Sequence, residues 1–161
     1  MNLRISVLVI ACLVSLAACH TGARDATPYM SESGLIFEID DGTGIFYSGN
    51  KTFVPIYCDT KYPVRAMDIG QENFNAISDL VTSGDIWTAK VEPVPGCQIL
   101  DVARQGQHYK FEIPGKSISL DVGQCQRIDP PHEPYIKAMS RIVRTVSDRQ
   151  TLRVRGQCAY F

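Results

Sequence analysis

Turn-forming residues divide much of this chain into short segments. Groups rich in glycine, together with proline, aspartate or asparagine, stand at 41–42, 49–50, 93–96, 105–107 and 114–116. Most segments between them carry β-branched and aromatic residues in loose alternation with polar ones, which is typical of strands that bury one face. We therefore predict strands at 34–40, 45–48, 52–58, 64–69, 86–92, 98–104, 108–113, 117–122 and 151–157.

Two segments have helical rather than strand periodicity. Between 71 and 83 the apolar residues recur at intervals of three and four, and Gly84 stands where a C-terminal cap belongs. Between 134 and 147 the apolar residues recur at the same period, with basic residues on another face. The combination predicts an α+β fold class, with an antiparallel sheet of about six to eight strands and two helices on one of its faces.

The N-terminus has the features of an export signal. A basic residue at the start precedes a nearly apolar run at 5–16, which as a helix would be about 18 Å long and too short for a hydrocarbon core of about 30 Å. The run ends in Leu16-Ala17-Ala18-Cys19, which resembles the lipobox of bacterial lipoproteins. The resemblance implies cleavage before Cys19 and lipidation of its sulfur and of its new amine. The alternative is an ordinary signal peptide with a chance cysteine.

The same resemblance implies a location. Lipoproteins with aspartate after the cysteine tend to stay at the inner membrane, whereas this chain has His20. We therefore expect a lipid anchor in the outer membrane, with the protein facing the periplasm. Two or more acyl chains hold a protein stably on a bilayer, since each buried methylene contributes about 0.8 kcal/mol. The expected divisions are a signal peptide at 1–18, a polar tether at 19–33 and one domain at 34–161.

Four cysteines remain in the expected domain, namely Cys58, Cys97, Cys125 and Cys158. An even number in an oxidising compartment indicates two disulfides. Their spacing contains no C-x-x-C pair, so it indicates neither a zinc site nor a redox motif, and we expect no metal or cofactor. Three pairings are possible, and we favour Cys58–Cys97 together with Cys125–Cys158.

Charge is distributed unevenly along the chain. Residues 19–128 carry 14 acidic and 9 basic side chains, a net of −5, whereas residues 129–161 carry 3 acidic and 6 basic ones, a net of +3. Neither part has the basic density of a nucleic-acid-binding protein. The basic residues near the C-terminus form either a surface for an acidic protein or lipid headgroups, or a solvated face. The candidate partner-binding residues are Lys137, Arg141, Arg144, Arg153 and Arg155.

Catalytic motifs are weak in this sequence. The stretch at 40–44 (DDGTG) resembles the Asp-Thr/Ser-Gly turn of aspartic proteases, but Asp41 occupies the hydroxyl position and no second copy follows. We interpret it as a hairpin turn. His108 and His132 are the histidines beyond the tether, and we interpret His132 with Glu133 as the entrance of a helix. The sequence contains no nucleophile elbow, H-E-x-x-H motif or phosphate loop.

Three classes of function remain open. We favour a non-enzymatic module that binds a periplasmic protein, in the manner of inhibitor, immunity or secretion-apparatus lipoproteins, on the expected location alone. The second class is a structural envelope lipoprotein that contacts peptidoglycan through aromatic side chains. The aromatic candidates are Trp87, Tyr109, Tyr135 and Tyr160. The third class is a hydrolase whose site is not displayed by any motif.

Overall fold

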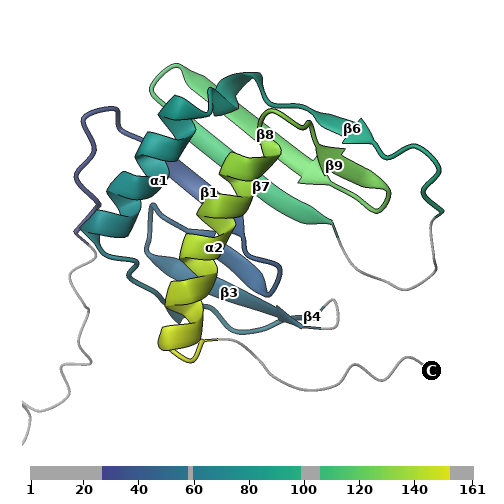
Figure 1. Cartoon of the computed structure of the whole chain (residues 1–161). Helices are drawn as coiled ribbons and strands as arrows, with labels where there is room; N and C mark the ends of the chain where they lie inside the picture. The colour runs from purple at the N-terminus through teal and green to yellow at the C-terminus, as the bar shows by residue number, and fades with distance from the viewer. Residues whose placement is uncertain (1–26, 58–59, 99–105, 153–161) are drawn as a thin grey trace, which may run out of the picture.

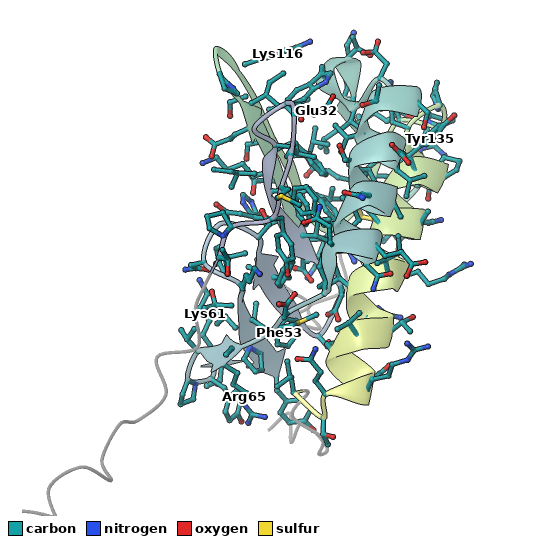
Figure 2. The ribbon with its side chains drawn as sticks, turned by 90° about the vertical axis from the view of Figure 1, so that its left-hand side faces the viewer. Glu32, Phe53, Lys61, Arg65, Lys116 and Tyr135 are labelled. Carbon is teal, nitrogen blue, oxygen red and sulfur yellow. A yellow bond between two sulfur atoms is a disulfide. The ribbon has the colours of Figure 1, made fainter. Side chains whose placement is uncertain are left out.

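The computed structural model describes residues 27–57, 60–98 and 106–152. These residues form two layers, with a seven-stranded antiparallel sheet in one layer and two helices in the other (Figure 1; Figure 2, seen after a quarter turn). The α+β class predicted from the sequence is therefore confirmed. In the described part of the chain, no helix is long and apolar enough to cross a membrane.

The large sheet has the strand order β4-β3-β2-β1-β7-β8, and β5 also pairs with β3. Its strands are β1 (Ile36–Asp40), β2 (Gly44–Tyr47), β3 (Thr52–Tyr57), β4 (Thr60–Lys61), β5 (Arg65–Ala66), β7 (Gln107–Ile113) and β8 (Lys116–Val122). The central strand β1 pairs with β2 on one side and β7 on the other, so Ile39 lies opposite both Phe46 and Tyr109. The tight turns predicted between neighbouring strands produce this hairpin topology.

A second, two-stranded sheet departs from the prediction of one strand at 86–92. Ile86–Thr88 forms a short 3-10 turn (η1) instead, because Asp85 adopts a left-handed backbone with φ 42° that reverses the chain. The strand begins only at β6 (Val91–Pro93), which pairs with β9 (Gln126–Ile128). The strands β4 and β9 were not predicted from the sequence. Residues 99–105 and 153–157, in which two further strands were predicted, lie outside the described residues.

The two predicted helices are confirmed as α1 (Gln71–Ser83) and α2 (Glu133–Arg149). They lie side by side across one face of the sheet (Figure 1). Between the layers lies a core whose largest side chains are phenylalanines, each at most 2% exposed. These residues are Phe37, Phe46, Phe53, Phe74 and Phe111. Burial of each such ring stabilises the fold by about 1.5–3 kcal/mol.

The favoured disulfide pairing is wrong, because Cys97 is bonded to Cys125, with their Cα atoms 5.4 Å apart. Cys97 follows β6 and Cys125 precedes β9, and the antiparallel pairing of these two strands brings the cysteines together. The backbone hydrogen bond from Val94 N to the Cys125 carbonyl, at 2.8 Å, belongs to the same connection. Cys58 and Cys158 lie outside the described residues.

Candidate functional site

Residues 28–33, which sequence analysis assigned to the tether, are packed against the helical layer. The ring of Tyr29 stacks on Phe74 of α1, with centroids 4.7 Å apart. Its hydroxyl donates a hydrogen bond to the Asp68 carboxylate at 2.8 Å and accepts one from the Ile69 backbone N–H at 2.9 Å. Tyr29 therefore belongs with the folded domain rather than with a flexible tether.

A second contact attaches this segment to the first residue of α1. The side-chain amide of Gln71 accepts a hydrogen bond from Met30 N at 2.9 Å and donates one to the Met30 carbonyl at 2.8 Å. It also donates to Asn75 Oδ1 at 2.8 Å. A single side chain thus pairs with both backbone groups of one residue, as a neighbouring strand would.

The protonation states of Tyr29 and Asp68 reinforce the first contact. Burial, and then the hydrogen bond to Asp68, raise the pKa of Tyr29 well above its ordinary value. Burial acts to raise the pKa of Asp68 as well, but hydrogen bonds from Gly70 N, Tyr29 and Lys51 outweigh it and lower that pKa. The proton therefore stays on the tyrosine, which remains a donor to a charged carboxylate.

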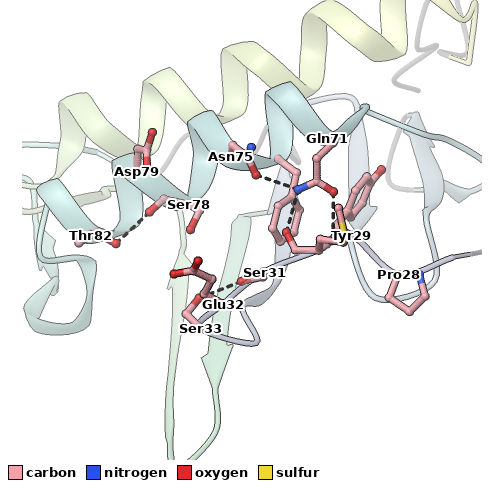
Figure 3. A pocket seen from close by; sticks show the side chains of 12 residues that line it. Pro28, Tyr29, Ser31, Glu32, Ser33, Gln71, Asn75, Ser78, Asp79 and Thr82 are labelled. Carbon is pink, nitrogen blue, oxygen red and sulfur yellow. Dashed lines mark hydrogen bonds between the residues drawn. The ribbon is translucent and has the colours of Figure 1, made fainter.

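A groove of about 1,110 Å³ lies between this segment and α1 (Figure 3). We call it the α1 groove. Its helical wall is a stripe of polar side chains at intervals of four, three and four residues, and its outer wall is formed by residues 28–33. Figure 3 shows the Glu32 side chain directed from this wall toward α1. The lining residues from α1 are Gln71, Phe74, Asn75, Ser78, Asp79 and Thr82.

The lining of the α1 groove is polar and acidic. Its charged side chains are Glu32 and Asp79, and neither forms an ion pair with another described residue. The hydroxyl of Ser78 has no side-chain partner in the same part of the structure, and the amide N–H group of Asn75 is likewise available as a donor. The groove can therefore offer both carboxylate acceptors and neutral donors to a ligand.

The basic residues proposed to bind a partner are only partly available. Lys137 and Arg141 are exposed on α2, but the Lys137 ammonium lies 2.5 Å from Glu133 Oε1, one turn earlier in the helix. Such an exposed pair neutralises charge without much stabilisation. Arg153 and Arg155 lie outside the described residues.

Arg144, the third candidate basic residue on α2, contacts the turn at 40–44. Its guanidinium donates to the backbone carbonyl of Asp41, from Nε at 3.0 Å. The carboxylate of Asp41 accepts hydrogen bonds from Thr43 N at 2.8 Å and from the Thr43 hydroxyl at 2.6 Å, and Asp40 accepts one from Gly42 N at 2.6 Å. The DDGTG stretch thus forms the turn between β1 and β2, as interpreted from the sequence.

His132 is part of a relay that sequence analysis missed. Its Nδ1 lies 2.7 Å from Asp129 Oδ2, and its Nε2 lies 3.2 Å from the Thr88 hydroxyl. The other carboxylate oxygen of Asp129 accepts a hydrogen bond from Lys90 N at 2.9 Å. Burial acts to raise the pKa of Asp129, but the hydrogen bonds from Lys90 N and His132 outweigh it and lower that pKa. The order carboxylate, imidazole, hydroxyl is that of an activated nucleophile.

The surroundings of this relay do not support acyl transfer. The Thr88 hydroxyl also lies 3.1 Å from both the carbonyl and the carboxylate of Asp85, which compete with the imidazole for its proton. Backbone N–H groups of Thr88 and Ala89 donate within η1, and those of Tyr135 and Ile136 donate to a carbonyl at the start of α2. These groups are therefore not free to stabilise an oxyanion.

His108 lies on the face of the sheet opposite the helices and links three strands. Its Nδ1 is 2.6 Å from Asp121 on β8, and its Nε2 is 3.5 Å from Glu38 on β1. The two carboxylates contact different ring nitrogens, so the three groups do not converge on one point. Among the described residues, no group of three or more His, Cys, Asp or Glu side chains is placed to hold a metal ion.

The aromatic residues proposed to stack on sugars are separated in the structure. Tyr109 is 3% exposed in the core, and Tyr135 and Trp87 are partly buried against it. The Lys116 ammonium lies over the Trp87 ring, 5.0 Å from its centroid. Tyr160 lies outside the described residues.

The helical wall of the α1 groove has a signal in the sequence, since its polar side chains recur with helical period. Its outer wall has none, because residues 28–33 precede α1 by about 40 positions and carry no strand or helix pattern.

Comparisons of the chain with protein-family models, with curated protein sequences and with solved structures found no match.

Proposed function

We propose that this chain is an exported, lipid-anchored protein whose domain is a non-enzymatic module that binds a protein partner in the α1 groove. The observation that carries the proposal is the groove itself. It is an open polar cavity in which the carboxylates of Glu32 and Asp79 and the hydroxyl of Ser78 have no partner among the other described side chains. Ligand sites are concave and carry a few polar groups that fix the orientation of the ligand.

The position of the groove fits an anchored receptor. Its outer wall is formed by the first described residues of the chain, and Tyr29 follows the expected anchor, Cys19, by only ten positions. Ten residues span at most about 36 Å. A partner bound in the groove would therefore be held close to the membrane that carries the lipid.

A second candidate function, hydrolysis, is favoured by one observation, the Asp129–His132–Thr88 relay. We rank it below binding because the neighbouring backbone N–H groups already have acceptors. The relay is also absent from the lining of the α1 groove.

Site-specific cross-linking in the source bacterium tests the binding proposal. A photoreactive phenylalanine analogue is placed at Asn75 or Ser78 in the groove, and at Ser119 on the opposite face of the sheet as the matched control. We expect both groove positions to give one adduct of the same mass and Ser119 to give none. Absence of an adduct at the groove positions, or equal adducts at all three, contradicts the proposal.

Metabolic labelling with a palmitate analogue tests the proposed anchor. We expect label in the wild type and in Cys12→Ala, whose cysteine leaves with the signal peptide, but not in Cys19→Ala. Equal labelling of the wild type and Cys19→Ala contradicts the lipid anchor.

A further inference from the structure

We infer that the α1 groove takes an extended peptide segment bearing a lysine or arginine side chain, with Glu32 as its main carboxylate partner and Asp79 as the second. The inference rests on the proposed function and specifies the chemistry of the partner. Three features of the groove support it, namely its charge, its hydrogen-bonding groups and the arrangement of its aromatic rings.

The charge of the groove favours a cation. Its two carboxylates have no basic side chain among the described lining residues. The nearby Lys51 is already engaged, since its ammonium is 3.3 Å from Asp68 and 4.3 Å from the centroid of the Tyr29 ring. Two carboxylates that line the same concave surface concentrate negative potential there. Each of them also forms a stronger hydrogen bond with a charged donor than with a neutral one.

The hydrogen-bonding groups of the groove favour a peptide backbone. Gln71, at one end of the polar stripe, already forms hydrogen bonds with the backbone N–H and the carbonyl of Met30. Asn75 and Ser78 continue the stripe along α1, and their side chains offer an amide N–H and a hydroxyl that no other described side chain occupies. A peptide backbone lying along this stripe would meet side-chain donors and acceptors of the same kind as those that bind Met30.

The aromatic rings of the groove disfavour a sugar. Carbohydrates bind proteins by placing their apolar face on an exposed ring. Here Tyr29 covers one side of Phe74 and Phe37 lies stacked at 5.5 Å from it, while Lys51 lies over the Tyr29 ring. The aromatic surface is therefore already covered by other side chains, so a glycan would lack its usual platform.

Binding of short labelled peptides to the detergent-solubilised full chain tests the inference. The probe is fluorescein-labelled Gly-Ser-Lys-Ser-Gly, compared by fluorescence anisotropy at low salt with the same peptide carrying Glu in place of Lys. We expect the lysine peptide to bind saturably and at least about tenfold more tightly. We expect Glu32→Gln to weaken its binding about fivefold and Asp79→Asn about twofold. Glu72→Gln removes the same charge from an exposed position on α1 outside the groove and should leave binding within about twofold.

Other outcomes overturn the inference in distinguishable ways. Equal binding of the two peptides, or equal loss in Glu72→Gln and Glu32→Gln, rules out a specific cation site. Saturable binding of chitotetraose at the groove, lost in Ser78→Ala, identifies a glycan instead. If neither peptide binds while cross-linking at Asn75 and Ser78 still yields an adduct, the inference fails and the proposed function stands. If the adduct is also absent, both fail.

Discussion

The hydroxyl of Ser147 donates a hydrogen bond to the Asp41 carboxylate at 2.9 Å, across a separation of 106 residues. Both residues are 0% exposed. The same carboxylate accepts two hydrogen bonds from Thr43, so one buried acidic group organises the β1–β2 turn and attaches it to the last turns of α2. A motif that resembles a protease signature in the sequence is therefore a structural junction between the two layers.

Loss of this junction should destabilise the fold. Asp41→Ala removes the acceptor of the Thr43 N–H and hydroxyl, whereas the Ser147 hydroxyl keeps the Arg144 carbonyl at 3.0 Å as an alternative acceptor. We expect a loss of about 2–3 kcal/mol in the free energy of unfolding. Ser147→Ala should lose about 1–2 kcal/mol, because it removes one hydrogen bond to a charged group. Urea unfolding measures both values.

A double-mutant cycle supplies the control for this prediction. If the two residues act through their mutual hydrogen bond, the losses in Asp41→Ala and Ser147→Ala should not add in the double variant, with a coupling of about 1 kcal/mol. Additive losses would show that the residues stabilise the fold independently.

The parts of the fold that depend on local pattern could be predicted from the sequence. The apolar period of 71–83 predicts α1 because one helical face must be buried, and Phe74, Ile77 and Val81 are indeed buried. The tight turns at 41–42 and 114–116 predict hairpins because they reverse the chain over two or three residues. These features need only neighbouring residues to be explained.

The parts that failed depend on contacts between distant residues. The 86–92 strand was mispredicted because nothing in the alternation shows that Asp85 adopts a left-handed φ. The cysteine pairing was mispredicted because it follows from the short β6–β9 ladder, in which only three residues pair. Only the helical wall of the α1 groove could be predicted from the sequence, because its polar side chains recur with helical period. The outer wall could not, because its position depends on contacts of Tyr29 with residues about 40 positions away.

The Cys97–Cys125 disulfide should contribute substantially to stability. The bond joins cysteines that are 28 positions apart in the sequence. In the chain-entropy model, a loop of this length lowers the entropy of the unfolded chain enough to add about 3–4 kcal/mol to the free energy of unfolding. We expect the double variant Cys97→Ser/Cys125→Ser to lose about this amount in urea unfolding. Proteolysis of the unreduced wild type should release one cross-linked peptide that contains both cysteines. A peptide joining Cys97 to Cys58 would contradict the pairing.

The packing of residues 28–33 should weaken in acid. The lowered pKa of Asp68 means that its charged form stabilises the folded state above the ordinary aspartate pKa near 3.9, and that this contribution is lost as the pH falls through the folded-state pKa. The Asp68 side chain is 59% exposed, so we expect at most about 1 kcal/mol. The protection of the Met30 and Ile69 amides, measured as the exchange rate relative to the intrinsic rate at each pH, should therefore fall below about pH 4.

The matched variant for this pH dependence is Asp68→Asn. It retains a side-chain acceptor for Tyr29 but cannot titrate, so the Met30 amide should no longer lose protection in acid. An unchanged pH profile in Asp68→Asn would assign the effect to another carboxylate.

The Asp129–His132–Thr88 relay should act as a structural link between η1 and α2. His132→Ala leaves the Asp129 carboxylate, 16% exposed, without its imidazole partner, and we expect a loss of about 1–3 kcal/mol in the free energy of unfolding. Thr88→Val keeps the shape of the exposed side chain without its hydroxyl and should cost under about 1 kcal/mol. A hydrolase would behave differently, because removal of the nucleophile abolishes turnover without a comparable loss of stability. Turnover of wall fragments or peptides that disappears in folded Thr88→Val would therefore reverse our ranking, since a hydroxyl that only links two elements has no reason to control a reaction rate.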